Sequence, residues 1–371
     1  MRFKTEAFWV CVLLFGINLT IYMYPSQMDI TGWRQSLASR SQQVNYAAAE
    51  EVPQPPEYGH PKDLTATQRS KKPLFILLMS SSGRSGSTLV TELLGTRGNS
   101  VVFFEPLFKT ISQEKDPCHL NGTCIPQYLK SIAECGYSQE FEDWFKERTL
   151  FYSYFNIDVN NCFVYADDKK KCKMIDVRGK CRNSVLRVIK VIRSRVAWIE
   201  GLLKDDSLNM KLIYLTRDPR ATLASYAHMG WKNKPLNQCT IMDKDMVDFD
   251  RLTKLYPNKA YQMEIEKLSA DPVASIQEMF DFLFGSPEIH DETMVFINTH
   301  MYSNVSVSFG MNTAAYSYEE YQAWRWEITE QLLNETEKEP ICKSVLKKLK
   351  HEVFGSLKRA RDKNVSLFNY D

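Results

Sequence analysis

The residues best suited to chemistry lie in one short loop, Gly83-Arg84-Ser85-Gly86-Ser87-Thr88, between an apolar run and a periodic leucine pattern. The apolar run 74–79 predicts a buried strand, and the leucines of residues 89–94 predict one face of a helix. Glycines at such a junction free backbone N–H groups at the positive end of the helix, which favours an anion. With Arg84, Ser87 and Thr88 as further donors, the segment predicts a phosphate-binding loop; a Ser/Gly linker without a ligand is the alternative.

The loop differs from the common nucleotide-binding sequence. It has no Gly-x-x-x-x-Gly-Lys, and Arg84 stands where a lysine would be sought. Ordinary ATP or GTP hydrolysis is therefore disfavoured, and a nucleotide-dependent kinase with an atypical P-loop is kept only as a lesser alternative.

A second strand-turn-helix segment follows at residues 211–226. Asp218 suits a helix N-cap and Pro219 suits the first helical position, so Arg217 lies at the strand's end and Ser225 two turns along the helix. Taken alone, both arginines of the turn could simply be exposed beside a cap. Together with the first loop, the segment predicts a ligand with two separate phosphate-like ends.

These two segments resemble the sulfotransferases that use 3′-phosphoadenosine 5′-phosphosulfate, and specifically the Golgi carbohydrate 6-O-sulfotransferases that act on N-acetylglucosamine, galactose or N-acetylgalactosamine. The resemblance implies that the 5′-phosphosulfate is held by Arg84, Ser85, Gly86, Ser87 and Thr88, and the 3′-phosphate by Arg217 and Ser225. It extends through the segments 104–107, 181–184, 190–193 and 324–326 and through Cys342. One segment departs: Glu264-Ile-Glu266-Lys267-Leu268 stands where the family often has Arg-Tyr-Glu-Asp-Leu.

Strand candidates and helical patterns alternate along the chain. The strand candidates are 74–79, 101–104, 173–177, 188–192 and 212–216. This alternation predicts an α/β fold, a P-loop-like central parallel sheet flanked by helices, with ligands at the carboxyl ends of the strands.

Sulfuryl transfer needs a base for the acceptor hydroxyl and positive charge near the leaving oxygen. Glu105, at the carboxyl end of the run 101–104, is the favoured base, and a structural acid paired with an arginine is its alternative. Arg84 is expected to stabilise charge at the transferring group. His119 and His228 are less favoured bases, since nothing near them in sequence orients the ring.

Further residues have weaker assignments. Lys190 and Arg193 lie on different faces of a strand-like segment, so at most one is expected to reach the site. Trp324 and Trp326 are expected in core packing, with stacking on sugars as the alternative. No metal-ligand cluster is evident, and no metal is expected.

The N-terminal region predicts a membrane anchor. Residues 1–6 form a cytoplasmic tail, 7–24 an apolar transmembrane signal anchor, 25–72 a polar stem, and 73–371 the lumenal sulfotransferase domain. A cleaved signal peptide is the alternative, but its apolar core would usually be ~7–15 residues long.

Cysteines and glycosylation sequons agree with a lumenal domain. Eight of the nine cysteines follow the anchor, and their irregular spacing favours disulfides over zinc. Four N-glycosylation sequons also follow it, at Asn121, Asn304, Asn334 and Asn364.

The whole chain is thus expected to be a Golgi type II membrane enzyme that sulfates a sugar hydroxyl, at the 6-position, on glycoprotein or proteoglycan glycans. A membrane-tethered glycan-binding protein that has kept the fold but lost the chemistry is the alternative from another class. A net charge of +2 gives no reason to expect a nucleic-acid partner. A homodimer is left open.

Overall fold

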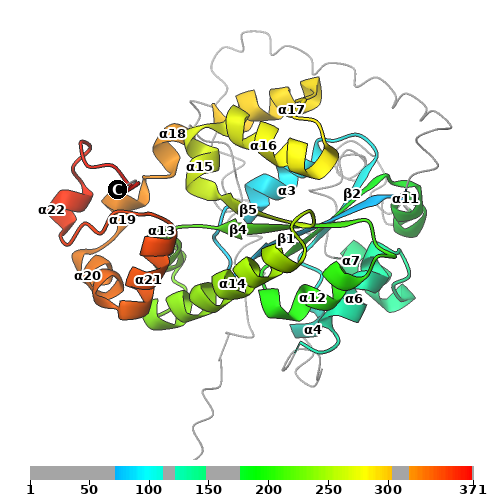
Figure 1. The fold of residues 1–371 in the computed structure, drawn as a ribbon, viewed down its shortest axis with the longest axis horizontal. Helices are drawn as coiled ribbons and strands as arrows, with labels where there is room; N and C mark the ends of the chain where they lie inside the picture. The colour runs from blue at the N-terminus through cyan, green and yellow to red at the C-terminus, as the bar shows by residue number, and fades with distance from the viewer. Residues whose placement is uncertain (1–71, 112–121, 148–175, 303–316, 370–371) are drawn as a thin grey trace, which may run out of the picture. The chain divides into compact units, whose positions relative to one another are not determined.

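The computed structural model describes residues 72–111, 122–147, 176–302 and 317–369 (Figure 1). Its centre is a sheet of five parallel strands in the order β2-β3-β1-β4-β5. The strands are β1 (Leu74–Ser80), β2 (Ser100–Phe104), β3 (Leu186–Val191), β4 (Met210–Thr216) and β5 (Ala260–Glu264). The predicted parallel α/β architecture is confirmed.

Four of the five predicted strands are present. The candidate at 173–177 is wrong where it can be described, because Asp176 accepts a hydrogen bond from the Gly179 N–H and caps a helix that begins at Val177. Residues 173–175 lie outside the described ranges. The sequence analysis missed β5, a short strand that ends in the acidic residue Glu264.

Side chains of each strand alternate between two apolar layers. Phe75, Leu77 and Met79 of β1 face one layer, whereas Ile76 and Leu78 face the other. Burial on both faces explains why the strands read as continuous apolar runs.

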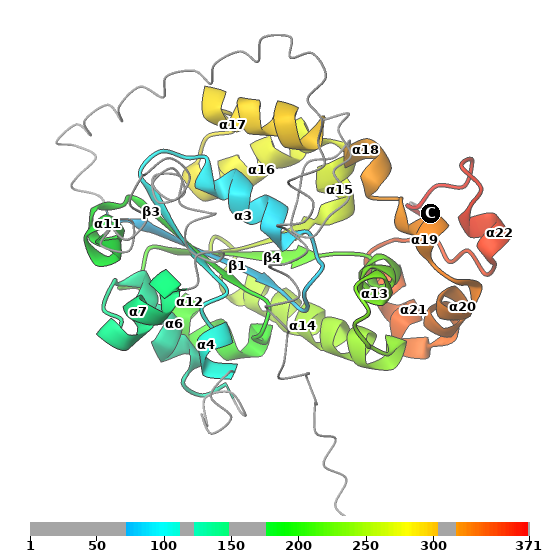
Figure 2. The same cartoon turned by 180° about the vertical axis from the view of Figure 1, so that it is seen from behind.

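Helices cover both faces (Figure 2). The first layer packs against α6 (Ile125–Ala133), α7 (Gln139–Glu147), α12 (Glu200–Lys204) and α14 (Pro235–Leu255), with α11 (Val177–Asn183) and the 3₁₀ turn Val196–Ile199. The second packs against α3 (Ser87–Gly95), α15 (Ile265–Ala270), α16 (Pro272–Phe284), α17 (Asp291–Phe296) and the π-helical turn Ile297–Met301. The short α4 (Phe108–Ile111) follows β2.

A C-terminal group of helices packs beside α13 (Pro219–His228), beyond one end of the sheet in Figure 1. It consists of α18 (Ser317–Glu320), α19 (Trp324–Glu327), α20 (Glu330–Lys338), α21 (Pro340–Lys348) and α22 (Leu357–Ala360). Trp324 is 2% exposed within this cluster, so it has the predicted packing role, whereas Trp326 is 43% exposed. We call residues 317–369 the C-terminal segment.

Two disulfides join described residues, as the cysteine pattern predicted. Cys135 bonds to Cys181, and Cys239 of α14 bonds to Cys342 of α21. Cys118, Cys162 and Cys172 lie outside the described ranges, as do the sequons at Asn121 and Asn304.

The predicted anchor at 7–24 also lies outside the described residues, as does the stem up to residue 71. Within the part of the chain that the structure describes, no helix combines the length and the apolar character needed to cross a bilayer.

Candidate active site at the carboxyl end of the sheet

The turn between β1 and α3 adopts the compact shape expected of an anion-binding loop. Arg84 and Gly86 both have left-handed backbone conformations, with φ of 58° and 79°. A Cβ at Gly86 would lie 2.5 Å from Ile265 Cδ1, so only glycine fits there. Gly86 is the N-cap of α3 and no side chain caps it, so the first N–H groups of α3 remain for a ligand.

The two predicted phosphate motifs meet in space. Arg84 Nε donates to Ser225 Oγ at 2.9 Å, and Arg217 Nη1 donates to the Arg84 carbonyl oxygen at 2.8 Å. The loop and α13 are therefore adjacent, although these residues are more than 130 positions apart in sequence.

The two arginines at this junction form no ion pair with a carboxylate of the described residues. Burial and the neighbouring Arg217 charge lower the pKa of Arg84, against a weaker opposing effect of Tyr226. Among the described residues, no Asp or Glu forms an ion pair with Arg84 or Arg217. Two adjacent cations that are not ion-paired within the described residues favour an anionic ligand.

The hydroxyl groups of the loop have different surroundings. Ser85 is buried, and its Oγ donates to Ser80 Oγ at 2.9 Å, so it holds the loop's shape. Ser87 and Thr88 occupy the first two positions of α3, where Ser87 is buried and Thr88 is half-buried.

The loop is also held from behind by residues that the sequence analysis did not single out. Gln238 Nε2 of α14 donates to Ser82 Oγ at 2.9 Å, and Tyr214 Oη of β4 lies 2.7 Å from Ser81 Oγ. No local motif marks either residue, because each acts across more than 130 positions.

Glu105 lies directly after β2 in a left-handed conformation with φ of 50°. Its N–H continues the ladder by donating to the Lys190 carbonyl at 3.0 Å. Its Oε1 accepts from Lys190 Nζ at 2.7 Å, and its Oε2 pairs with Arg193. Both cations therefore reach Glu105, and the prediction that at most one would do so is wrong. β3 ends at Val191, so the alternation of side chains in a strand does not extend to Arg193. Arg193 can therefore pair with Glu105 on the same side as Lys190.

The pKa values of Glu105 and Lys190 are both shifted from their usual ranges. Burial alone would raise the pKa of Glu105, but Lys190 and Arg193 outweigh it and hold that pKa below its usual range. Burial lowers the pKa of Lys190 against the opposing effect of Glu105, and Arg193 and Arg84 lower it further. Glu105 is thus ionised at neutral pH, and it can orient a hydroxyl, but it is a weak base while both cations remain in place.

A buried charge network lies behind the second motif. Asp218 accepts from the Arg220 N–H at 2.8 Å and pairs with the Arg220 side chain, which confirms the predicted N-cap. Both side chains are fully buried, so Arg220 is not the exposed residue that one alternative described. His351 bridges two carboxylates, with Nδ1 3.0 Å from Asp218 Oδ2 and Nε2 2.9 Å from Glu264 Oε1.

One group of potential metal ligands occurs in the described residues, where the sequence showed none. Ligand atoms of Glu264, Glu266 and His351 lie within 4.8 Å of one another. Burial opposes protonation of His351, but hydrogen bonds to Asp218 and Glu264 prevail and raise its pKa to about 10. A protonated imidazole has no lone pair for a metal, so we interpret the group as an ion-pair network.

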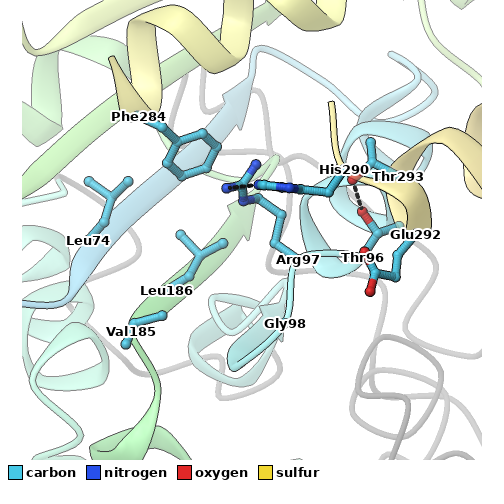
Figure 3. A pocket seen from close by; sticks show the side chains of 10 residues that line it. All are labelled: Leu74, Thr96, Arg97, Gly98, Val185, Leu186, Phe284, His290, Glu292 and Thr293. Carbon is cyan, nitrogen blue, oxygen red and sulfur yellow. Dashed lines mark hydrogen bonds between the residues drawn. The ribbon is translucent and has the colours of Figure 1, made fainter. Parts of the chain in front are cut away.

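A cavity of about 350 Å³ lies at the opposite, amino end of β1 (Figure 3). Leu74, Phe284 and His290 line it together with Arg97, whose guanidinium lies 3.0 Å from His290 Nε2 and 4.0 Å from the centre of the Phe284 ring. The length of β1 separates this cavity from the phosphate loop.

Of the two remaining base candidates, the described one, His228, is not brought to the site. His228 is exposed at the end of α13, away from the helix terminus that carries Asp218. His119 lies outside the described residues.

Comparisons with known proteins show similarity to sulfotransferases. A model of the sulfotransferase family matches residues 73–287. The chain is 21% identical over 349 residues to carbohydrate sulfotransferase 1 of Danio rerio. The match covers 80% of this chain and 82% of that protein. It is 23% identical over 323 residues to carbohydrate sulfotransferase 4 of Mus musculus, covering 72% and 79% of the two chains. The sulfotransferase domain of the Synechococcus PCC 7002 olefin synthase has a TM-score of 0.40 and 18% identity, covering 74% of this chain and 95% of that domain.

Proposed function

Because the chain belongs to the sulfotransferase family of transferases, we propose that it transfers a sulfuryl group from 3′-phosphoadenosine 5′-phosphosulfate to a carbohydrate hydroxyl. The observation that carries the proposal is the junction of Arg84, Arg217 and Ser225, which unites two cationic motifs at one loop. A nucleotide with anionic groups at its 5′ and 3′ positions fits two adjacent cations that form no ion pair among the described residues.

The residues present fit this donor. The loop 84–88 and the amino end of α3 would receive the 5′-phosphosulfate through N–H groups and the Arg84 guanidinium. Arg217 and the Ser225 hydroxyl would receive the 3′-phosphate. In this structure, the Ser225 hydroxyl accepts a hydrogen bond from Arg84 Nε. This contact holds the phosphosulfate loop next to the residues proposed for the 3′-phosphate.

The proposed chemistry is an in-line displacement at sulfur. The acceptor oxygen forms a bond to sulfur, the bond from sulfur to the phosphate oxygen breaks, and the acceptor proton passes to a base. Glu105 is the proposed base. Arg84 and Lys190 would stabilise the charge on the departing phosphate oxygen, and the same charge would draw Lys190 away from Glu105 and strengthen it as a base.

The acceptor and the location are also proposals. Two curated relatives are named carbohydrate sulfotransferases, so we propose a glycan acceptor and, as the finer assignment, the 6-hydroxyl of N-acetylglucosamine, galactose or N-acetylgalactosamine. We place the enzyme in the Golgi membrane as a single-pass type II protein with residues 73–371 in the lumen. The two disulfides support an oxidising compartment.

The test of activity uses the purified full-length chain, sulfur-labelled donor and a panel of chondroitin, keratan-type and N-acetylglucosamine-terminated glycans. We expect labelled ester on at least one acceptor. Folded protein that binds glycans but transfers no label would support the binding-protein alternative, and metal-dependent ATP turnover would support the kinase alternative.

The location is tested by membrane extraction and glycosidase digestion. We expect the chain to stay in membranes after alkaline washing and to lose mass when N-glycans are removed. A chain that alkali releases and that carries no glycan at any sequon would overturn the proposed topology.

A further inference from the structure

The turn that carries Arg217 is supported by residues that lie outside the central strands. It joins β4 to α13, and its own capping residue Asp218 carries a negative charge with no exposure to solvent. A buried charge of this kind keeps its position only while its hydrogen-bond partners stay in place. The geometry of Arg217 therefore depends on what surrounds Asp218.

One of those partners, His351, comes from the C-terminal segment, and the same segment holds a second partner, Arg220, in place. Arg220, which pairs with Asp218, donates through Nη1 to the Glu352 carbonyl at 2.8 Å and to Glu337 at 2.5 Å. His351 Nδ1 lies 3.0 Å from Asp218 Oδ2. Glu337, His351 and Glu352 lie beyond residue 287, where the match to the family model ends.

His351 also joins the ends of two neighbouring strands. Glu264 is the last residue of β5, and it is the register partner of Thr216, the last residue of β4. By bridging Glu264 and Asp218, His351 fixes the β4–α13 turn to β5. Glu266 completes the support, since its Oε1 accepts from the Asp218 N–H at 2.8 Å.

We propose that His351 is a positioning residue for the donor's 3′-phosphate site, acting through Asp218 on the adjacent Arg217. This inference rests on the proposed function, because it assumes that Arg217 binds a 3′-phosphate. Without His351, Asp218 and Glu264 would lose their shared partner, and repulsion among Asp218, Glu264 and Glu266 would displace the turn. The C-terminal segment would then support the donor site through Asp218, although both predicted phosphate motifs lie outside this segment.

The experiment compares two nucleotides on the full-length chain. Adenosine 3′,5′-bisphosphate carries the 3′-phosphate and adenosine 5′-phosphate does not. The dissociation constant of adenosine 5′-phosphate divided by that of the bisphosphate therefore reports the 3′ site alone. We expect His351→Gln to reduce this ratio about tenfold, equivalent to about 1.4 kcal/mol, with little change in the affinity for adenosine 5′-phosphate. His290→Gln, in the cavity at the other end of β1, is the matched control and should leave the ratio unchanged.

A merely structural role would give a different result. If His351→Gln weakens both nucleotides equally, or leaves the ratio at its wild-type value, the proposal is wrong. Should that variant fail to fold, Glu264→Gln removes only the outer half of the bridge, and an unchanged ratio there would equally overturn the proposal. A wild-type chain that does not distinguish the two nucleotides would refute the proposed 3′-phosphate site itself, and the inference with it.

Discussion

At the scale of single residues, Glu105 combines the features of a catalytic group and of a structural one. It is buried and ionised, and two cations hold both of its oxygens. Yet it lies in a left-handed conformation at the carboxyl end of the sheet, and its partner Lys190 is close enough to Arg84 for the two charges to interact. Such backbone strain persists only where the surroundings enforce it, and it is frequent at active sites.

Substituting Glu105 by glutamine separates the two roles. We expect Glu105→Gln to slow transfer by about 100- to 10,000-fold, because the proton acceptor is lost. The change also removes the negative charge that Lys190 and Arg193 share, so the affinity for adenosine 3′,5′-bisphosphate should not fall. Glu142→Gln is a matched control, since Glu142 is also a buried acid held by a lysine and an arginine. Normal turnover by Glu105→Gln would make Glu105 a structural residue.

His351 gives a pH dependence whose sign follows from its raised pKa. Its pKa rises from 6.5 to about 10 on folding, so the folded chain binds the extra proton and gains stability that is lost as pH rises toward 10. Burial, aided by Asp218 and Glu264, likewise raises the pKa of Glu266 from 4.5 to about 7, and the corresponding stability is lost between those values. Above pH 7, only His351 of these two groups should still make the stability depend on pH.

We therefore expect the difference in Tm between the wild-type chain and His351→Gln to shrink between pH 7 and pH 10. Thermal unfolding at several pH values measures it, with His290→Gln as the reference for a histidine change. A difference that stays constant from pH 7 to pH 10 would mean that His351 is already neutral in the folded chain and would contradict the prediction.

At the scale of elements, the site depends on how a loop and two helices meet. α3 begins at Gly86 and α13 follows Asp218, so both helices direct their amino ends toward the same edge of the sheet. α14 supports the phosphate loop through the hydrogen bond from Gln238 to Ser82. Such an arrangement concentrates partial positive charge at one point and favours a doubly anionic ligand.

The shape of the first turn can be tested at Gly86. Gly86→Ala forces a Cβ against Ile265 and a non-glycine residue into φ of 79°, so we expect a loss of about 1–3 kcal/mol in unfolding free energy and weaker nucleotide binding. Denaturant unfolding and nucleotide titration measure both. Gly98→Ala is the control, because a Cβ there meets no atom within 4 Å, and equal effects at the two positions would contradict the argument.

At the scale of the whole molecule, a disulfide secures the C-terminal segment to the sheet layer. Cys239 and Cys342 are 103 positions apart, and their bond joins α14, which supports the phosphate loop, to α21, which precedes His351. Cross-linking distant positions stabilises a fold mainly by restricting the unfolded chain.

Removal of this bond by Cys239→Ser with Cys342→Ser should lower the free energy of unfolding by about 2–4 kcal/mol. If the C-terminal segment positions the donor site, the same variant should also weaken binding of adenosine 3′,5′-bisphosphate. Loss of the Cys135–Cys181 bond, within the layer of α6 and α11, is the comparison and should reduce stability without changing the nucleotide ratio. Equal changes in the ratio would show that the two bonds act only on general stability.

The sequence by itself determined the local elements and the chemistry of the two motifs. Apolar runs bounded by Gly, Pro and Asp specify β1, β4 and the starts of α3 and α13, because strand burial, helix capping and glycine conformations depend on neighbouring residues. The strand at 173–177 was wrong because an N-cap at Asp176 outweighed a short apolar pattern.

Only the tertiary structure decided which charges meet. That Arg84 contacts Ser225, that both Lys190 and Arg193 hold Glu105, and that His351 joins Asp218 to Glu264 all depend on strand order and on turns after the strands. Each contact spans more than 80 positions, and no spacing rule links residues that are brought together by packing. The physical reason is that a buried charge is stabilised by whichever partner the fold places beside it, wherever that partner lies in the chain.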